Sequence, residues 1–294
     1  MQPRSSLVRL SSRIAFITYS GEPDIAADDL PLASELEKRG LAVRACPWDG
    51  AHQEHSDPLT LVIRSPWNYD SAPEHFLLWL ESLEKSGHRV INPCAVVRWN
   101  IHKRYLLEAA ARELPVPRTA LLPGSAAERD AVIRGFAHHE YVVLKPAISL
   151  SAHHTSRVHR TELIEAVRRL PFAEREYMIQ EFIPDIASGE LSFIFFGGQF
   201  SHCIRKIPKA GDFRTQEDFG ATRVRYEPTR EEIDNASRFL ALAPQQPVFA
   251  RVDLVRTASS LLLMEIELID PTLFLGWAPE SVPRLANLIA DAAR

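Results

Sequence analysis

Three acidic residues and one arginine alternate with apolar residues along two predicted strands that follow each other in the chain. The stretch FARVDLVR places Arg251 and Asp253 on one face of a strand. The stretch LLLMEIEL places Glu265 and Glu267 on one face of the strand that returns. If Asp253 pairs with Glu265, all three carboxylates gather on one surface, whereas a slip of one residue would disperse them. That register puts Arg251 opposite Glu267 and requires a connection of three or five residues.

Clustered carboxylates repel one another, and a bound hard cation relieves that repulsion. Oxygen-only ligands suit Mg²⁺, or Mn²⁺, better than Zn²⁺. The opposite face of the two strands is predicted to be core and carries Val252, Leu254, Met264 and Ile266. The alternative is a solvated hairpin face, on which a cross-strand pair of Arg251 and Glu267 contributes about a few tenths of a kcal/mol.

The composition is that of a globular protein and favours neither a nucleic-acid nor a membrane partner. The chain has 294 residues, enough for about two compact units, and its net charge of −4 does not provide the basic surface that such partners attract. No apolar run approaches the roughly 18 residues of a membrane span. The 3 cysteines are too far apart for a disulfide framework or a metal knuckle, so a reducing cytoplasm fits best. The N-terminal MQPRSSLVRLSSR is either an organelle-targeting peptide or a disordered tip.

The first hundred residues alternate between apolar strands and amphipathic helices. Strands are predicted over 13–20, 41–48, 59–69 and the segment RVINP, and helices over 30–40 and 73–87. This order predicts a small parallel α/β sheet that extends to about residue 97.

The rest of the chain combines helices with antiparallel strands. Helices are predicted over 101–112, over 125–137 with Ser125 as cap, over 160–171 with Thr161 as cap, after Thr229, and at the end of the chain. Two hairpins are predicted, one about the Gly197-Gly198 turn and the other formed by the carboxylate strands.

Seven segments in order resemble the ATP-grasp ligases. They are Lys103, VVLKP, MIQEFIP, GELSF, IRKIPKAGDFRTQ, ARVDLV and LLLMEIELIDP, and the resemblance spans roughly residues 98 to 275. The segment RKIPKAGDFRTQEDFGA is similar to one in prokaryotic glutathione synthetases. The segments VIRSPWNY, GELSFIFFGGQFSH and MEIELIDPTLFL resemble the glutathione-synthetase-like group that includes a cycloserine-forming cyclo-ligase acting on O-ureidoserine.

The resemblance implies an α/β fold with an N-terminal parallel pre-ATP-grasp domain and two α+β subdomains that clasp a nucleotide. The implied boundaries are 1–97, 98–176 and 177–294, the last carrying the metal site. The resemblance also implies the residues that bind ATP and Mg²⁺. These are Lys103, Lys145 and Ser151 on the phosphates, Gln180, Glu181 and Ile183 around the adenine, Glu190 on the ribose, and Asp253, Glu265 and Glu267 on the metal ion.

The loop after Lys145 departs from the family pattern. The covering loop is usually rich in glycine, so that backbone N–H groups approach phosphates closely, whereas ISLSAHHTSR has no glycine. Its hydroxyls and its His or Arg side chains would then replace backbone contacts. Each of Lys145, Lys103 and Glu190 also has a plain reading as a surface charge.

The implied reaction transfers the γ-phosphoryl group of ATP to a substrate carboxylate, and an amine then displaces phosphate. Arg251, Arg214 and Lys206 are the expected catalytic cations, although Arg214 and Lys206 also fit as surface charges. Arg64 and Trp67 are expected to bind a small amino-acid-like substrate, with a local Arg64–Asp70 pair as the alternative.

Three functions therefore remain open. The first is a ligase of the O-ureidoserine cyclo-ligase type, and the second is a glutathione-synthetase-like peptide or amide ligase. The third is an ATP-binding protein without turnover, to which the glycine-free loop points. Dimers are common among the relatives that the chain resembles, so the sequence leaves a homodimer open.

Overall fold

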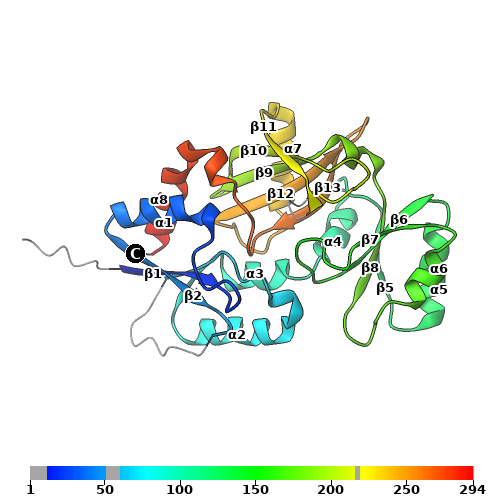
Figure 1. The fold of residues 1–294 in the computed structure, drawn as a ribbon, viewed down its shortest axis with the longest axis horizontal. Helices are drawn as coiled ribbons and strands as arrows, with labels where there is room; N and C mark the ends of the chain where they lie inside the picture. The colour runs from blue at the N-terminus through cyan, green and yellow to red at the C-terminus, as the bar shows by residue number, and fades with distance from the viewer. Residues whose placement is uncertain (1–11, 51–59, 216–218, 294) are drawn as a thin grey trace, which may run out of the picture.

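The computed structural model describes residues 12–50, 60–215 and 219–293, and it arranges them around three sheets (Figure 1). Residues 1–11, most of the segment for which a targeting peptide or a disordered tip is expected, lie outside the described residues.

The N-terminal sheet is parallel, with strand order β2-β1-β3-β4, as the alternation of strands and helices predicts. Its elements are β1 (Ser12–Thr18), α1 (Leu30–Lys38), β2 (Leu41–Pro47), β3 (Thr60–Ile63), α2 (Pro73–Lys85) and β4 (Arg89–Ile91). Helix α1 packs Leu32 and Leu36 on one face of the sheet. Helix α2 packs Phe76 and Leu80 on the other face.

The last helix, α8 (Val282–Ala292), packs against both the N-terminal sheet and the C-terminal sheet. Leu285 and Ile289 of α8 belong to one apolar cluster with Ile14 of the N-terminal sheet and Phe196 of the C-terminal sheet. Helix α8 also lies against α1, as Figure 1 shows. The N-terminal domain and the C-terminal part therefore share one continuous core.

The central sheet is antiparallel, with strand order β5-β8-β6-β7. Its elements are β5 (Thr119–Leu122), α5 (Ala126–Phe136), β6 (Tyr141–Pro146), β7 (Ser156–His159), α6 (Leu163–Arg168) and β8 (Tyr177–Glu181). Ser125 caps α5, as predicted, by accepting a hydrogen bond from the Glu128 N–H. The predicted cap at Thr161 is wrong, because α6 starts after Glu162 and has no side-chain cap.

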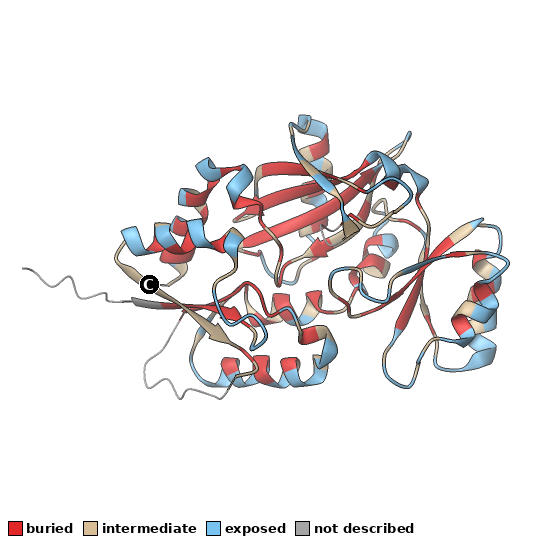
Figure 2. Ribbon diagram, in the orientation of Figure 1, coloured by how far each residue is buried: buried red, intermediate tan, exposed pale blue. Residues whose placement is uncertain are grey.

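The C-terminal sheet is antiparallel, with strand order β11-β10-β9-β12-β13. Its elements are η3 (Pro184–Ser188), β9 (Glu190–Phe196), β10 (Gln199–Ile207), β11 (Thr222–Tyr226), α7 (Arg230–Leu240), β12 (Phe249–Arg256) and β13 (Leu261–Glu267), followed by the short turns η5 (Leu275–Trp277) and η6 (Pro279–Ser281). Thr229 caps α7 in a reciprocal capping box with Glu232. Figure 2 shows the central strands of this sheet buried along their length.

The predicted helix over 101–112 is shorter, α4 (Tyr105–Ala111), and a helix that was not predicted, α3 (Cys94–Asn100), precedes it. The backbone N–H of Lys103 donates to the Ala147 oxygen at 2.8 Å, so it is not available to a continuous helix. This break holds Lys103 against the loop that follows β6.

The hairpin of β12 and β13 adopts the register that gathers the carboxylates. Asp253 pairs with Glu265, and Arg251 pairs with Glu267. The register then shifts, so that Leu254 pairs with Leu263, and the connection is 257–260, which is four residues and not three or five. This β-bulge takes Met264 out of the alternation, so Met264 packs near Ile183 and Ile186 and not in the core behind the sheet.

Candidate active site

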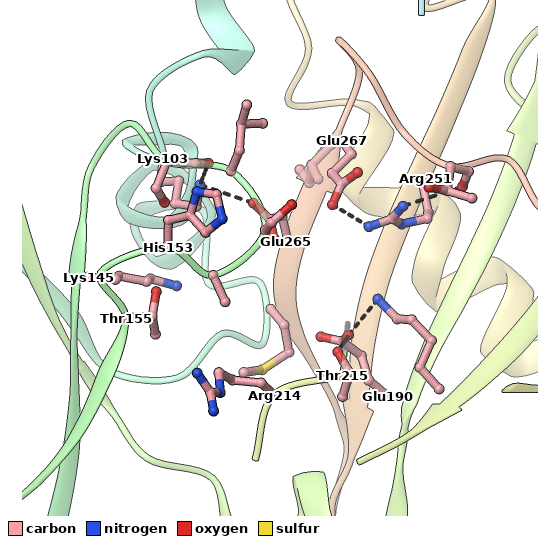
Figure 3. A pocket seen from close by; sticks show the side chains of 18 of the residues that line it. Lys103, Lys145, His153, Thr155, Glu190, Arg214, Thr215, Arg251, Glu265 and Glu267 are labelled. Carbon is pink, nitrogen blue, oxygen red and sulfur yellow. Dashed lines mark hydrogen bonds and ion pairs between the residues drawn. The ribbon is translucent and has the colours of Figure 1, made fainter. Parts of the chain in front are cut away.

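The site is a cavity of about 570 Å³ between the central sheet, the C-terminal sheet and the N-terminal domain. Strands β6 and β8, the loop after β6, β13 and the segment after it supply most of its wall. Figure 3 shows cations and carboxylates from these elements facing one another across it. All the predicted site residues except Arg64 and Asp253 line the cavity, and Asp253 lies directly behind the wall.

One end of the cavity is apolar. This apolar slot is lined by Val143, Phe182, Ile183, Phe213 and Met264, and the last four belong to one apolar cluster. Glu181 and Ile183 lie at the end of β8 beside this slot. A flat aromatic group such as a purine fits between apolar walls of this kind.

Two buried lysines lie next to the slot. The Lys145 Nζ donates to the Gln180 Oε1 at 2.9 Å, and Gln180 in turn donates to Thr119. Burial lowers the pKa of Lys145 to about 8. Among the described residues no carboxylate forms an ion pair with Lys145, so this buried cation can take an anion from a ligand.

The second lysine, Lys103, connects the loop after β6 to the carboxylate hairpin. Its Nζ donates to the Ser149 oxygen at 2.9 Å and lies 3.1 Å from the Glu265 Oε1. Lys103 is 8% exposed, so this ion pair is shielded from water.

The three carboxylates converge. One oxygen each from Asp253, Glu265 and Glu267 lies within 4.8 Å of the others. Burial would raise the pKa of Asp253, but Arg251 and Lys206 outweigh it and lower that pKa to about 2. Burial raises the pKa of Glu267 to about 8, although Arg251 opposes this. Closely spaced carboxylate oxygens are the donor set that hard divalent cations prefer, so the residues fit a metal such as Mg²⁺.

Arg251 and Lys206 bridge these carboxylates to the rest of the site. The Arg251 Nε donates to the Asp253 Oδ1 at 3.1 Å, and its Nη2 pairs with Glu267. The Lys206 Nζ lies 2.9 Å from the Asp253 Oδ2 and 2.6 Å from the Glu190 Oε2. Neither cation is a surface charge, because both are at least nine-tenths buried.

The loop after β6 covers the cavity without glycine. Ser151, Ala152 and His154 have φ values of 47°, 55° and 57°, in the left-handed region that glycine usually occupies. Ile148 and Leu150 pack against the core of the N-terminal domain, which holds the loop closed over the site. Ser151 and His153 line the cavity, and Figure 3 shows His153 beside Lys103 and Glu265.

Arg64 departs from the sequence-based expectation. Its side chain is 2% exposed and does not line the cavity, because the Nε donates to the Asp29 Oδ1 at 2.9 Å and the Nη2 donates to the Pro271 oxygen at 2.8 Å. The local pair with Asp70 is not formed either. Arg64 is therefore a buried tie between the N-terminal domain and the segment after β13, and the substrate-carboxylate role does not fit it.

Trp67, the other residue expected to bind substrate, and Arg214, an expected catalytic cation, do reach the cavity. Trp67 lines it at 39% exposure. Arg214 also lines it, with its guanidinium paired to Asp212 at 2.7 Å and stacked 3.5 Å from the Phe219 ring centroid.

Sequence reasoning missed several residues of the wall. Met264 is exposed to the cavity by the bulge, for which the apolar alternation contains no signal. Thr215 donates to the Glu190 Oε2 at 2.6 Å, and Asp270 also lines the cavity. The Asp-Pro pair that begins three residues after Glu267 was a signal that could have pointed to Asp270.

An apolar slot, two buried lysines and a carboxylate cluster between two antiparallel sheets define the class of ATP-grasp proteins. Comparison with protein families agrees: the ATP-grasp domain of prokaryotic glutathione synthetase matches residues 118–275, more than half of the chain. The N-terminal domain of D-cycloserine synthetase DcsG matches residues 14–92.

Whole-chain relatives support the same assignment. The cycloserine biosynthesis protein DcsG of Streptomyces lavendulae is 30% identical, over 95% of this chain and 98% of that protein. A glutathione synthetase of Prochlorococcus marinus (strain MIT 9313) is 26% identical, over 91% of this chain and 85% of that protein. The crystal structure of D-cycloserine synthetase DcsG superposes with a TM-score of 0.84 at 28% identity, covering 96% of this chain and all of that one.

A more distant structure shares the fold. The RimK domain ATP-grasp protein of Sphaerobacter thermophilus has a TM-score of 0.70 at 17% identity, over 96% of this chain and 99% of that one.

The chain belongs to the ATP-grasp ligases, in the family of prokaryotic glutathione synthetases and D-cycloserine synthetase DcsG. It is an ATP-dependent ligase that forms a C–N bond, releases ADP, uses a divalent metal ion and acts on small molecules. None of the helices in the described ranges has the length and apolarity to cross a membrane.

Proposed function

We propose that this ligase closes a ring in a small amino-acid-like substrate, as in the conversion of O-ureidoserine to cycloserine, and so serves antibiotic biosynthesis. The observation that carries the proposal is the match of residues 14–92 to the N-terminal domain of D-cycloserine synthetase DcsG. This domain lies outside residues 118–275, the part matched by the ATP-grasp domain of prokaryotic glutathione synthetase, and it contributes Trp67 and Tyr69 to the cavity. It therefore bears on the substrate and not only on ATP.

The nucleotide roles proposed for the cavity follow from its shape and charge. The apolar slot takes the adenine, with the backbone of Glu181 and Ile183 at its edge and Gln180 beside it. Lys145, Lys103 and the loop residue Ser151 face the phosphates. Glu190 lies on the side of the ribose and is held there by Thr215 and Lys206.

The carboxylates Asp253, Glu265 and Glu267 are proposed to hold Mg²⁺. When bound, the ion neutralises charge on the phosphate oxygens. The γ-phosphoryl group passes to the substrate carboxylate, ADP leaves, and an acylphosphate results. The substrate nitrogen then attacks the acyl carbon, the C–O bond to phosphate breaks, and the nitrogen loses its proton. With O-ureidoserine this ring closure leaves a carbamoyl group on the ring nitrogen, which water must remove as carbon dioxide and ammonia to give cycloserine.

Positive side chains stabilise the charge that develops in these two steps. Arg251 lies at the carboxylate cluster and can meet the acyl oxygen, Lys206 supports it from behind through Asp253, and Arg214 reaches in from the facing loop. Each contribution depends on prior positioning, which the mutual ion pairs of these residues supply.

A peptide or amide ligase of glutathione-synthetase type is the second candidate. It is favoured by the match of residues 118–275 to the ATP-grasp domain of prokaryotic glutathione synthetase. That match covers the nucleotide-binding part, which both candidates share, so it supports the second candidate less directly.

One assay separates these functions, because a cyclo-ligase needs a single organic substrate. ADP release is measured with MgATP plus O-ureidoserine alone, with a dipeptide plus glycine, and with ATP alone. ADP release with O-ureidoserine alone is the expected result. Release only when two organic substrates are present would favour the second candidate. Thermal stabilisation by ATP with no ADP under any condition would identify a nucleotide-binding protein without turnover.

A further inference from the structure

One polar part of the cavity wall is left unused by the nucleotide and metal roles. Tyr69 and Trp67 of the N-terminal domain and Asp270, which follows β13, form it. The Tyr69 hydroxyl donates to the Asp270 Oδ1 at 3.4 Å. Elements far apart in the sequence therefore bring one carboxylate and two aromatic rings together.

Asp270 is partly buried in the cavity wall and has no cation of its own. Among the described residues, no lysine, arginine or histidine nitrogen forms an ion pair with its oxygens, in contrast to Asp253 and Glu265 in the same cavity. Burial raises the pKa of Asp270 to about 6, although the more distant Arg251 and Arg64 lower it. A partly buried carboxylate that lacks a cationic partner is stabilised by a positively charged ligand group.

The aromatic rings suit a cation as well. The Tyr69 ring is buried and stacks on Phe76 at 5.1 Å between centroids, so its position is rigid. Trp67 is 39% exposed and forms the outer wall. Ammonium groups bind favourably over the face of a Trp ring, and a Tyr hydroxyl oxygen can accept a hydrogen bond from one.

This part of the wall lies next to the reaction centre. Asp270 is three residues after Glu267, and both line the cavity together with Arg251. The electrostatic coupling of Asp270 to both Arg251 and Glu267 indicates that the two sites are close. A small molecule can therefore present a carboxylate at Arg251 and an ammonium group at Asp270 at the same time.

We propose that Asp270, with the Tyr69 hydroxyl and the Trp67 ring, binds the ammonium group of the substrate. The substrate class is then an α-amino acid whose amine is free while its own carboxylate is activated. This inference rests on the proposed function, because it concerns the substrate of the same reaction. It adds a selection rule: carboxylates without a neighbouring ammonium group are poor substrates.

The test compares two substrates that differ only in the amine, O-ureidoserine and 3-(ureidooxy)propanoic acid, in the wild-type protein and in Asp270→Asn. In the wild type, kcat/KM for ADP release should favour the amine-bearing compound. In Asp270→Asn this preference should fall by about 10- to 100-fold, through a higher KM for O-ureidoserine, as expected for loss of one partner of a partly buried charge pair. The KM for ATP should stay within about twofold, because the lysines and the metal ligands are untouched.

Matched variants separate a direct contact between Asp270 and the substrate ammonium group from two other causes, the loss of one negative charge near the cavity and a folding defect. Glu22→Gln removes an equal charge from an exposed residue near the same opening, and it should leave the preference unchanged. Asp270→Glu keeps the charge and should restore part of the preference. N-acetyl-O-ureidoserine tests the wild type without any substitution, and it should be as poor a substrate as the amine-free acid.

The outcomes distinguish this inference from the proposed function. If the wild type turns over O-ureidoserine but Asp270→Asn keeps the full preference, or if the N-acetyl compound reacts equally well, the ammonium site is overturned alone. An equal effect of Glu22→Gln would also overturn it. If the wild type releases no ADP with O-ureidoserine, the proposed function fails. A panel of amino acids and their amine-free analogues then decides the Asp270 site, which equal rates for both sets would overturn.

Discussion

Replacing Glu265 by Gln should separate the metal-dependent from the metal-independent part of nucleotide binding. Glu265 lies 3.1 Å from Lys103, and its oxygen is within 4.8 Å of those of Asp253 and Glu267. The substitution keeps the shape of the side chain and removes one negative charge. It therefore removes a metal ligand and, at the same time, frees Lys103 from its ion pair.

These two consequences change the affinity for the nucleotide in opposite directions. With Mg²⁺ present, loss of the ligand should weaken nucleotide binding by about 10- to 100-fold, or ~1.4 to 2.7 kcal/mol, the range found when partners of a metal site are removed. Without Mg²⁺, binding should be unchanged or tighter, because Glu265 no longer repels the phosphates and Lys103 is no longer neutralised.

The assay is calorimetric titration of a non-hydrolysable ATP analogue, with Mg²⁺ and with a chelator. Glu84 of α2 forms an exposed ion pair with Arg98 of α3, far from any predicted site residue in the sequence. Glu84→Gln therefore serves as a charge control and should bind the ATP analogue like the wild type in both conditions. A Glu265→Gln protein that loses the same affinity with and without Mg²⁺ would refute the metal role, since general damage to the cavity would explain that result.

Three further predictions concern other parts of the site. Burial lowers the pKa of Lys145 to about 8, so the Kd for MgATP should rise between pH 7 and pH 9 as the side chain loses its positive charge. Lys145→Arg stays charged and should flatten this pH profile of Kd. A slope that is the same in Lys145→Arg would contradict the phosphate role. Arg251→Lys should lower kcat by about 100-fold while ATP affinity changes little, because a point charge replaces the guanidinium fork at the acyl oxygen; a loss confined to ATP binding would argue against this. Arg64→Ala should lower the free energy of unfolding in urea by about 3–5 kcal/mol, because it leaves Asp29 as an unpaired buried charge. The KM for the substrate should stay unchanged. A selective rise in that KM would return Arg64 to the substrate site.

Local patterns in the sequence were sufficient for the parts of this protein that depend on neighbours along the chain. The alternation of Arg251 with Asp253, and of Glu265 with Glu267, decided which side chains share a face, and the parallel N-terminal sheet followed from the order of strands and helices. The caps at Ser125 and Thr229 were equally local, since each hydrogen bond spans three residues.

Contacts between distant segments decided the rest. The bulge that turns Met264 into the cavity is a property of two strands in register, and no residue pattern in β13 alone encodes it. Arg64 lies at a strand end, as the sequence indicates, but its partner Asp29 is 35 residues away and decides that it is buried. Asp270 and Tyr69 are 201 residues apart, so only the packing of the N-terminal domain on the C-terminal sheet brings them together. Periodicity is local, whereas the wall of a cavity depends on which segments pack side by side, and that is settled when the whole core forms.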